Sequence, residues 1–221
     1  MREIIYSMKS ILALLFFFAS FPALAQTDVR AKAILDALAK KAATYKTLQA
    51  TFSANVPAPG GKGGTTQRGT FLMKGAKYRL TLPTQDTRCD GRTVWTFIKD
   101  ANEVQVSTPD ESSENGLSPI KLFTQFSDRN YKSRYIGDRT VGGKASQVVE
   151  LLPTKSSQAF KKVELAVAKA TGTPSGATVW DKSGAKYAYT IVSYTPNGAI
   201  ADAQFVWNAK ANPKVEVVDL R

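Results

Sequence analysis

The sequence predicts a mainly β fold of the α+β class, arranged as a long antiparallel meander with one helix at its start and another in its middle. Two observations lead to this prediction. Short runs of alternating polar and apolar residues fill most of the chain, and turn-forming residues such as glycine, proline, asparagine and aspartate separate the runs. A sheet of about ten or more strands must curl, so we expect a barrel-like shape.

The N-terminal stretch predicts a cleavable secretory signal over residues 1–25. The segment KSILALLFFFASFPALA (9–25) has a positive start, an apolar core and small residues before Gln26. The apolar core is too short to span a bilayer, which takes about 20 residues. We therefore expect a soluble exported protein with a single domain over residues 26–221, long enough for a sizeable core.

Two segments of the exported domain predict helices. The first runs from Asp28, a suitable N-cap, to about Leu48, because apolar residues recur near helical spacing and neither proline nor glycine interrupts them. The second is the short apolar segment SPIKLFTQF (118–126), which begins with a serine N-cap and a proline at the first helical position.

The alternating runs predict strands. The first covers residues 49–56, and a glycine-rich connection over 57–69 follows it. The later strands are expected at 69–74, 77–83, 86–90, 92–98, 103–108, 131–138, 145–152, 160–168, 176–181, 186–194, 202–208 and 214–219.

The pair Asp90-Gly91 predicts a tight β-hairpin of type I′, which needs a positive φ at both central residues. In the strand after it, Trp95 and Phe97 fall on one face and Val94, Thr96 and Ile98 on the other. Large apolar groups on both faces raise the question of what these side chains pack against.

Composition argues against several classes of function. The chain has no histidine and one cysteine, Cys89, which excludes a His-based catalytic triad and an internal disulfide and argues against a zinc site. The net charge is +12, but the basic residues are scattered, and an exported chain rarely meets nucleic acid. The charge fits a solvated surface, or attraction to anionic headgroups or an acidic partner. We expect no metal and no cofactor.

The informative feature is the set of large apolar side chains on the predicted strands and on the 118–126 helix. They can form either a packed core or the lining of a cavity, and periodicity does not distinguish the two. The candidates for a binding cavity are Phe71, Met73, Tyr78, Leu80, Leu82, Trp95, Phe97, Leu122, Phe123 and Phe126.

Several motifs, taken in their order along the chain, resemble the periplasmic outer-membrane lipoprotein carriers of the LolA family. The resemblance rests on the block from Asp90 to Phe97 with Gln105-Val106 after it, on the hairpin that contains Gly69, Lys74 and Arg79, and on the C-terminal end. The matching segments are LQATFSANV (48–56), GTFLMKGAKYRLTL (69–82), CDGRTVWTFIKDANEVQV (89–106), SPIKLF (118–123) and FVWNAKANPKVEVVDLR (205–221).

This resemblance implies an incomplete, unclosed antiparallel β-barrel that is covered by helices and encloses an apolar cavity. It implies a periplasmic chaperone, without cofactor or catalysis, that takes lipoproteins from an inner-membrane ABC-type transporter and shields their acyl chains on the way to the outer membrane. Trp95 and Phe97 would then face the helical lid or the acyl chains. We expect a monomer, and the outer-membrane acceptor is not identified by the sequence.

One motif departs from the family pattern. Many members carry an Arg-Pro pair after the hairpin lysine, and that arginine helps to hold the lid shut, whereas Lys74 is followed here by Gly75-Ala76. The lid contact is therefore not carried over to this chain. The alternatives are a lipid- or lipoprotein-sensing module of the same superfamily, an exported hydrolase without histidine, and a closed barrel with a packed interior.

Overall fold

The structure, a computed structural model, describes residues 28–58, 63–109, 131–154 and 160–221. The predicted signal (1–25) and the predicted helix at 118–126 lie outside the described residues. The helical elements are α1 (Val29–Ala42) and the 3₁₀ turns η1 (Asp202–Phe205) and η2 (Ala209–Ala211). The strands are β1 (Thr47–Pro57), β2 (Gly64–Lys74), β3 (Lys77–Thr81), β4 (Gln85–Cys89), β5 (Val94–Ile98), β6 (Glu103–Ser107), β7 (Tyr131–Val141), β8 (Lys144–Pro153), β9 (Phe160–Ala168), β10 (Pro174–Asp181), β11 (Lys186–Pro196) and β12 (Glu216–Asp219).

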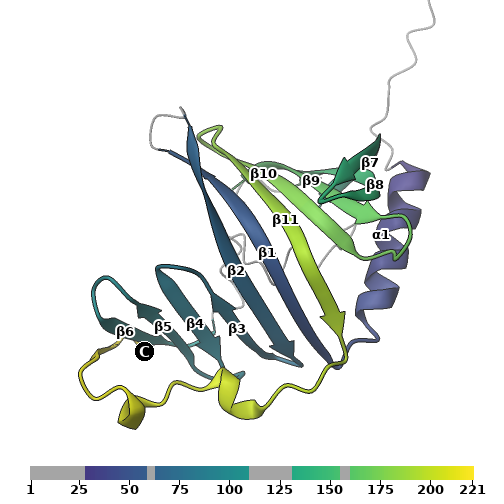
Figure 1. Cartoon of the computed structure of the whole chain (residues 1–221). Helices are drawn as coiled ribbons and strands as arrows, with labels where there is room; N and C mark the ends of the chain where they lie inside the picture. Colours follow the sequence, from purple (N-terminus) through teal and green to yellow (C-terminus); the bar gives the residue numbers. More distant parts are fainter. Residues whose placement is uncertain (1–27, 59–62, 110–130, 155–159) are drawn as a thin grey trace, which may run out of the picture.

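All twelve described strands belong to one curled sheet with the order β12-β6-β5-β4-β3-β2-β1-β11-β10-β9-β8-β7. Neighbouring strands are antiparallel, except that β12 runs parallel to β6. The edge strands β12 and β7 do not pair with each other, so the barrel stays open (Figure 1). The predicted mainly β, unclosed antiparallel fold is confirmed. None of the described helices is long and apolar enough to cross a membrane.

Helix α1 packs its apolar stripe onto the sheet, and the side of the sheet that it covers is called here the helix-side face. Its buried residues Ile34, Leu35 and Leu38 meet the side chains of β8 to β10 in the first core cluster. Asp28 caps the helix, as predicted, by accepting a hydrogen bond from the Arg30 amide at 2.8 Å. Its other carboxylate oxygen accepts from the Tyr135 amide of β7 at 3.0 Å, so one side chain joins the helix start to the sheet.

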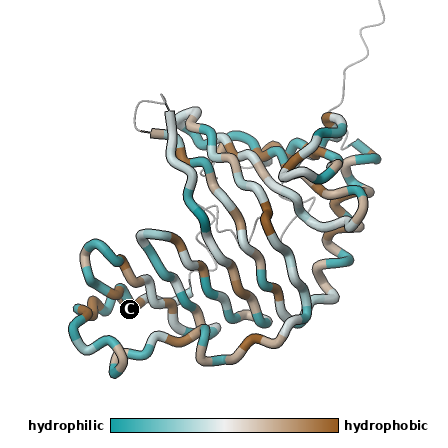
Figure 2. The backbone as a smooth tube through the Cα atoms, in the orientation of Figure 1, coloured by the Kyte–Doolittle hydropathy of each residue, from teal (hydrophilic) through white to brown (hydrophobic). Residues whose placement is uncertain are grey.

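A second core cluster lies on the same face, around β1, β2 and β11. Strand β1 alternates buried with more exposed positions along most of its length, and hydropathy changes repeatedly along the strands in Figure 2. Its Leu48 and Phe52 are buried against Phe71 and Ile191. Tyr189 touches both clusters, so the apolar surface continues from α1 across β11 to β2 and β3.

The other side of the sheet, called here the opposite face, is partly covered by the C-terminal segment that contains η1 (Figure 1). Phe205 is fully buried, and the rings of Trp207 and Phe97 lie 5.0 Å apart between centroids. Asp202 forms ion pairs with Lys74 at 3.0 Å and Lys77 at 3.2 Å. These contacts hold the segment against β2 to β5.

Asp86 of β4 is a buried carboxylate beneath this segment. Arg79 and Arg88 each approach one of its oxygens to 2.8 Å. Burial raises the pKa of Asp86, but the hydrogen bonds and charges of the two arginines outweigh burial and hold the pKa below its usual value. The arginines also reach the C-terminal segment, where Arg79 donates to Gln204 and Arg88 to the Val206 carbonyl.

The hairpin at Asp90-Gly91 is confirmed, but the predicted type I′ turn is wrong. Cys89 pairs with Val94, so four residues form the connection. Gly91 has a φ of +98°, whereas Asp90 is not among the described residues with positive φ. Instead the Asp90 carboxylate accepts hydrogen bonds from the amides of the two residues that follow Gly91, both at 2.8 Å.

The largest other differences from the predicted elements occur at three places. The first helix ends at Ala42 rather than near Leu48, because Thr47–Pro57 pairs with both β2 and β11. Residues 64–69 belong to β2 rather than to the glycine-rich connection, since they extend its ladder with β1. The strand predicted at 202–208 is instead η1 with irregular chain, which turns Phe205 inward.

Replacing the cap residue is expected to lower stability. Asp28→Ala removes the acceptors of the Arg30 and Tyr135 amides and should lower the melting temperature by a few degrees, measured by circular dichroism at neutral pH. Asp28→Asn keeps a side-chain oxygen that can accept a hydrogen bond, so its melting temperature should fall less. Equal melting temperatures for the wild type and the alanine variant would contradict this role.

Removing the buried carboxylate of Asp86 is expected to lower stability more than removing the helix cap at Asp28. Asp86→Asn leaves two half-buried guanidinium groups without their counter-charge, so the free energy of unfolding should fall by about 2–3 kcal/mol in urea titrations. The matched control is Asp219→Asn, whose partner Arg221 is exposed, and it should leave stability nearly unchanged.

The difference in stability between the wild type and Asp86→Asn should depend on pH. Because the folded-state pKa of Asp86 lies below its usual value of 3.8, its contribution is complete above that value and is lost as the pH falls through the folded pKa. The stability difference between the wild type and Asp86→Asn should therefore shrink in acid. A constant difference down to the acid transition would argue against a charged Asp86 in the folded state.

Candidate functional site

The predicted site residues on β2 and β3 come together on the helix-side face. Phe71 lies opposite Leu80 and Met73 opposite Tyr78, so all four side chains share this face. Leu82 joins them in the second core cluster. Phe71 is fully buried, whereas the other four are only partly buried and leave apolar surface accessible.

This surface is uncharged on its Tyr78 side. Burial, with a smaller effect of the neighbouring Cys89, raises the pKa of Tyr78 to about 12. Burial also raises the pKa of the Cys89 thiol, which is 1% exposed. Both groups are therefore neutral at physiological pH, and the thiol behaves as a small apolar strand residue.

Trp95 and Phe97 do not share this surface, contrary to the prediction. Across strands β2 to β5, Leu72 pairs with Arg79, Arg79 with Arg88, and Arg88 with Trp95. The side chains of this row are on the opposite face. Phe97 follows on the same side and packs against Trp207. The Phe97 ring is thus covered by the chain's own C-terminal segment, and Trp95 lies on the same face of the sheet.

The other predicted site residues, Leu122, Phe123 and Phe126, lie outside the described residues. The prediction missed several side chains that complete the apolar surface on the helix side. These are Leu48, Phe52, Val56, Tyr189, Ile191 and Tyr194. The alternation along β1 and β11 was the available signal for them.

The Phe52 ring occupies space that is free because residue 69 is a glycine. It lies opposite Gly69 in the ladder, and a Cβ on Gly69 would approach the Phe52 ring to 2.4 Å. The ring therefore covers the backbone of β2 at this point.

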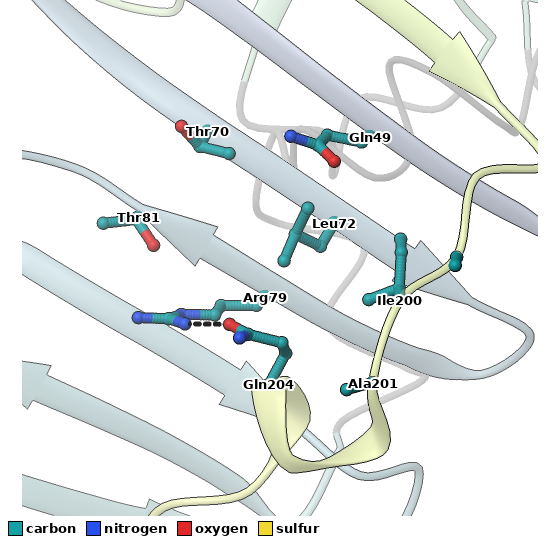
Figure 3. Close-up of a pocket in the computed structure, with 9 residues that line it drawn as sticks. Gln49, Thr70, Leu72, Arg79, Thr81, Ile200, Ala201 and Gln204 are labelled. Carbon is teal, nitrogen blue, oxygen red and sulfur yellow. Dashed lines mark hydrogen bonds between the residues drawn. The ribbon is translucent and has the colours of Figure 1, made fainter.

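The opposite face carries a hollow of about 390 Å³ between β1 to β3 and the C-terminal segment (Figure 3). Thr70, Thr81 and Arg79 line it from the sheet, and Ile200 and Gln204 from the C-terminal segment. An adjoining hollow of about 550 Å³ includes Arg68, Lys99 and Val192. Within the described part of the chain, no group of three His, Cys, Asp or Glu side chains could hold a metal ion.

Two solved structures of low sequence identity share the fold. An uncharacterized conserved protein from Thermus thermophilus superposes with a TM-score of 0.57 at 15% identity, over 86% of this chain and 99% of that one. MucB superposes with a TM-score of 0.52 at 20% identity, over 86% of this chain and 66% of MucB. A LolA superfamily protein from Nitrosomonas europaea gives a TM-score of 0.42 at 15% identity, over 80% of this chain and 97% of that one.

Sequence comparison identifies the family. No curated protein sequence matches the chain. Residues 43–208, from the end of α1 to just beyond Trp207, match the family described as outer membrane lipoprotein carrier protein LolA. Because this match covers most of the sequence, the chain belongs to the LolA family.

Proposed function

We propose that this protein is a periplasmic carrier that binds the acyl chains of lipoproteins and takes them from the inner to the outer membrane. The observation that supports the proposal most is the LolA family match, which coincides with a continuous apolar surface on the helix-side face. Proteins of this family are binding or carrier proteins rather than enzymes.

The proposed acyl-binding surface is formed by the partly buried side chains of Met73, Tyr78, Leu80 and Leu82, with Phe71 beneath them. Met73 suits this role because its unbranched chain adapts to irregular shapes. Trp95 and Phe97 are not part of it.

The energetics of release favour such a partly open surface. A fully buried sixteen-carbon chain would contribute about 12 kcal/mol, at about 0.8 kcal/mol per CH₂. Two or three chains bound that well would exceed the practical limit of non-covalent affinity, about 18–21 kcal/mol. A carrier that must release its cargo should therefore bury the chains only in part.

The proposed partners follow from the family. The cargo would come from an inner-membrane ABC-type transporter and pass to an acceptor at the outer membrane, with the carrier acting as a monomer. The alternative is a lipid- or lipoprotein-sensing module. The superposition on MucB supports only the shared fold and does not favour one function over the other.

The location of the binding surface can be tested with two leucines on neighbouring strands. Leu80→Gln changes the helix-side face and should weaken binding of a fluorescent acyl probe about ten-fold, because burial of one leucine contributes about 1.5 kcal/mol or more. Leu72→Gln changes the opposite face and should bind the probe like the wild type. Loss of binding in Leu72→Gln alone would contradict the proposed location and place the acyl chains on the opposite face.

The nature of the cargo can be tested by native mass spectrometry of the protein purified from the periplasm of a cell that makes lipoproteins. We expect acylated protein to co-purify with the wild type and to be depleted in Leu80→Gln. Free lipid alone would favour the sensing module. A bare protein that also takes up no acyl probe would contradict both.

A further inference from the structure

The two hollows of the opposite face form one groove. They share Thr70 and Thr81, so they join across β1, β2 and β3. The groove, called here the threonine groove, lies mainly on the opposite face, and Phe52 and Leu82 of the helix-side cluster border its second hollow. The C-terminal segment forms its wall at one end, and Val192 of β11, which is 62% exposed, borders the other end.

A row of small hydroxyl side chains forms the floor of the groove. Thr51 lies opposite Thr70, and Thr70 lies opposite Thr81, so the three side chains stand on one face at successive strands. Adjacent strands are about 4.8 Å apart, which spaces the hydroxyl groups regularly across the sheet. On β2 and β3 the neighbouring side chains of the same face, Arg68, Leu72 and Arg79, are longer than threonine, so the row is recessed between them.

The charge of the lining is one-sided. Arg68, Arg79 and Lys99 line the groove, and none of the lining residues is acidic, but Arg79 is already paired with the buried Asp86, so Arg68 and Lys99 carry the available positive charge. Arg68 is exposed and has no ion-pair partner among the residues that the structure describes. Lys99 donates to the carbonyls of Leu82 and Pro83 at 2.8 Å, so no carboxylate neutralises it there.

We propose that the threonine groove binds an extended acidic segment of a partner protein. Arg68 and Lys99 would attract carboxylates, the Thr70 hydroxyl group can donate a hydrogen bond to one of them, and the exposed Val192 offers contact to an apolar side chain. A flat bilayer of anionic lipid would meet Arg68 and Lys99 but would not reach the recessed threonine floor.

The experiment measures fluorescence anisotropy of a short fluorescein-labelled peptide of alternating glutamate and valine. The wild type should bind it, with an affinity that falls as salt is added, and a peptide of alternating lysine and valine should not bind. Arg68→Glu should weaken binding about five-fold, because an exposed ion pair contributes up to about 1 kcal/mol. Thr70→Tyr, which keeps every charge but fills the floor, should weaken it as well.

The matched control is Lys161→Glu, which makes the same charge change at an exposed position of β9, three strands away from β1. It should bind the peptide nearly as the wild type does, and unchanged thermal melts should show that all variants fold. Equal weakening by Arg68→Glu and Lys161→Glu would mean that net charge alone attracts the peptide, and would overturn the proposal.

Two further results distinguish binding of an acidic peptide from binding to an anionic membrane and from acyl-chain binding. If the protein binds vesicles containing anionic phosphatidylglycerol through Arg68, without sensitivity to Thr70→Tyr and without binding the peptide, the partner is a membrane and the proposal is wrong. Leu80→Gln should retain peptide binding, since it changes the other face. The groove can therefore fail while acyl binding stands, and the reverse.

Discussion

The antiparallel pairing of β1 with β11 is the constraint on which the rest of the sheet depends. Residues 48–55 pair with residues 188–196, which lie far away in sequence, while β1 also pairs with β2 along its whole length. This ladder joins the β2–β6 meander to the β7–β10 meander. Without it neither half could present a continuous surface, because the two core clusters meet at Tyr189 of β11.

A bulge in this ladder decides which side chains face which side. Thr51 pairs with Ser193 but Phe52 pairs with Ile191, so Val192 is skipped. Ile191 can then enter the second core cluster while Ser193 bonds to Thr51 on the other side, with 2.7 Å between their hydroxyl oxygens. Val192 remains exposed and borders the threonine groove. The extra residue of the bulge, Val192, thus lets Ile191 face the helix side and Ser193 the opposite side.

The two faces of the sheet are covered by different parts of the chain and have different chemistry. Helix α1 covers part of the helix-side face with aliphatic side chains, and the apolar surface beyond it carries neutral groups. The C-terminal segment covers part of the opposite face through Phe205, Trp207 and the arginines around Asp86. These two unlike faces fit the two proposals, an apolar cargo on the helix-side face and an acidic partner on the opposite face.

The sequence by itself determined the class of fold, the cap at Asp28, the hairpins and most strand positions, because these depend on local alternation and turn residues. It also carried the family resemblance. Only the tertiary structure decided that Phe71 and Trp95 face opposite sides, since the faces of separate strands are related by register and register is not local. Register also brings threonines from three strands into one groove. Tertiary contacts, rather than the local alternation, make residues 202–208 a covering segment instead of a strand.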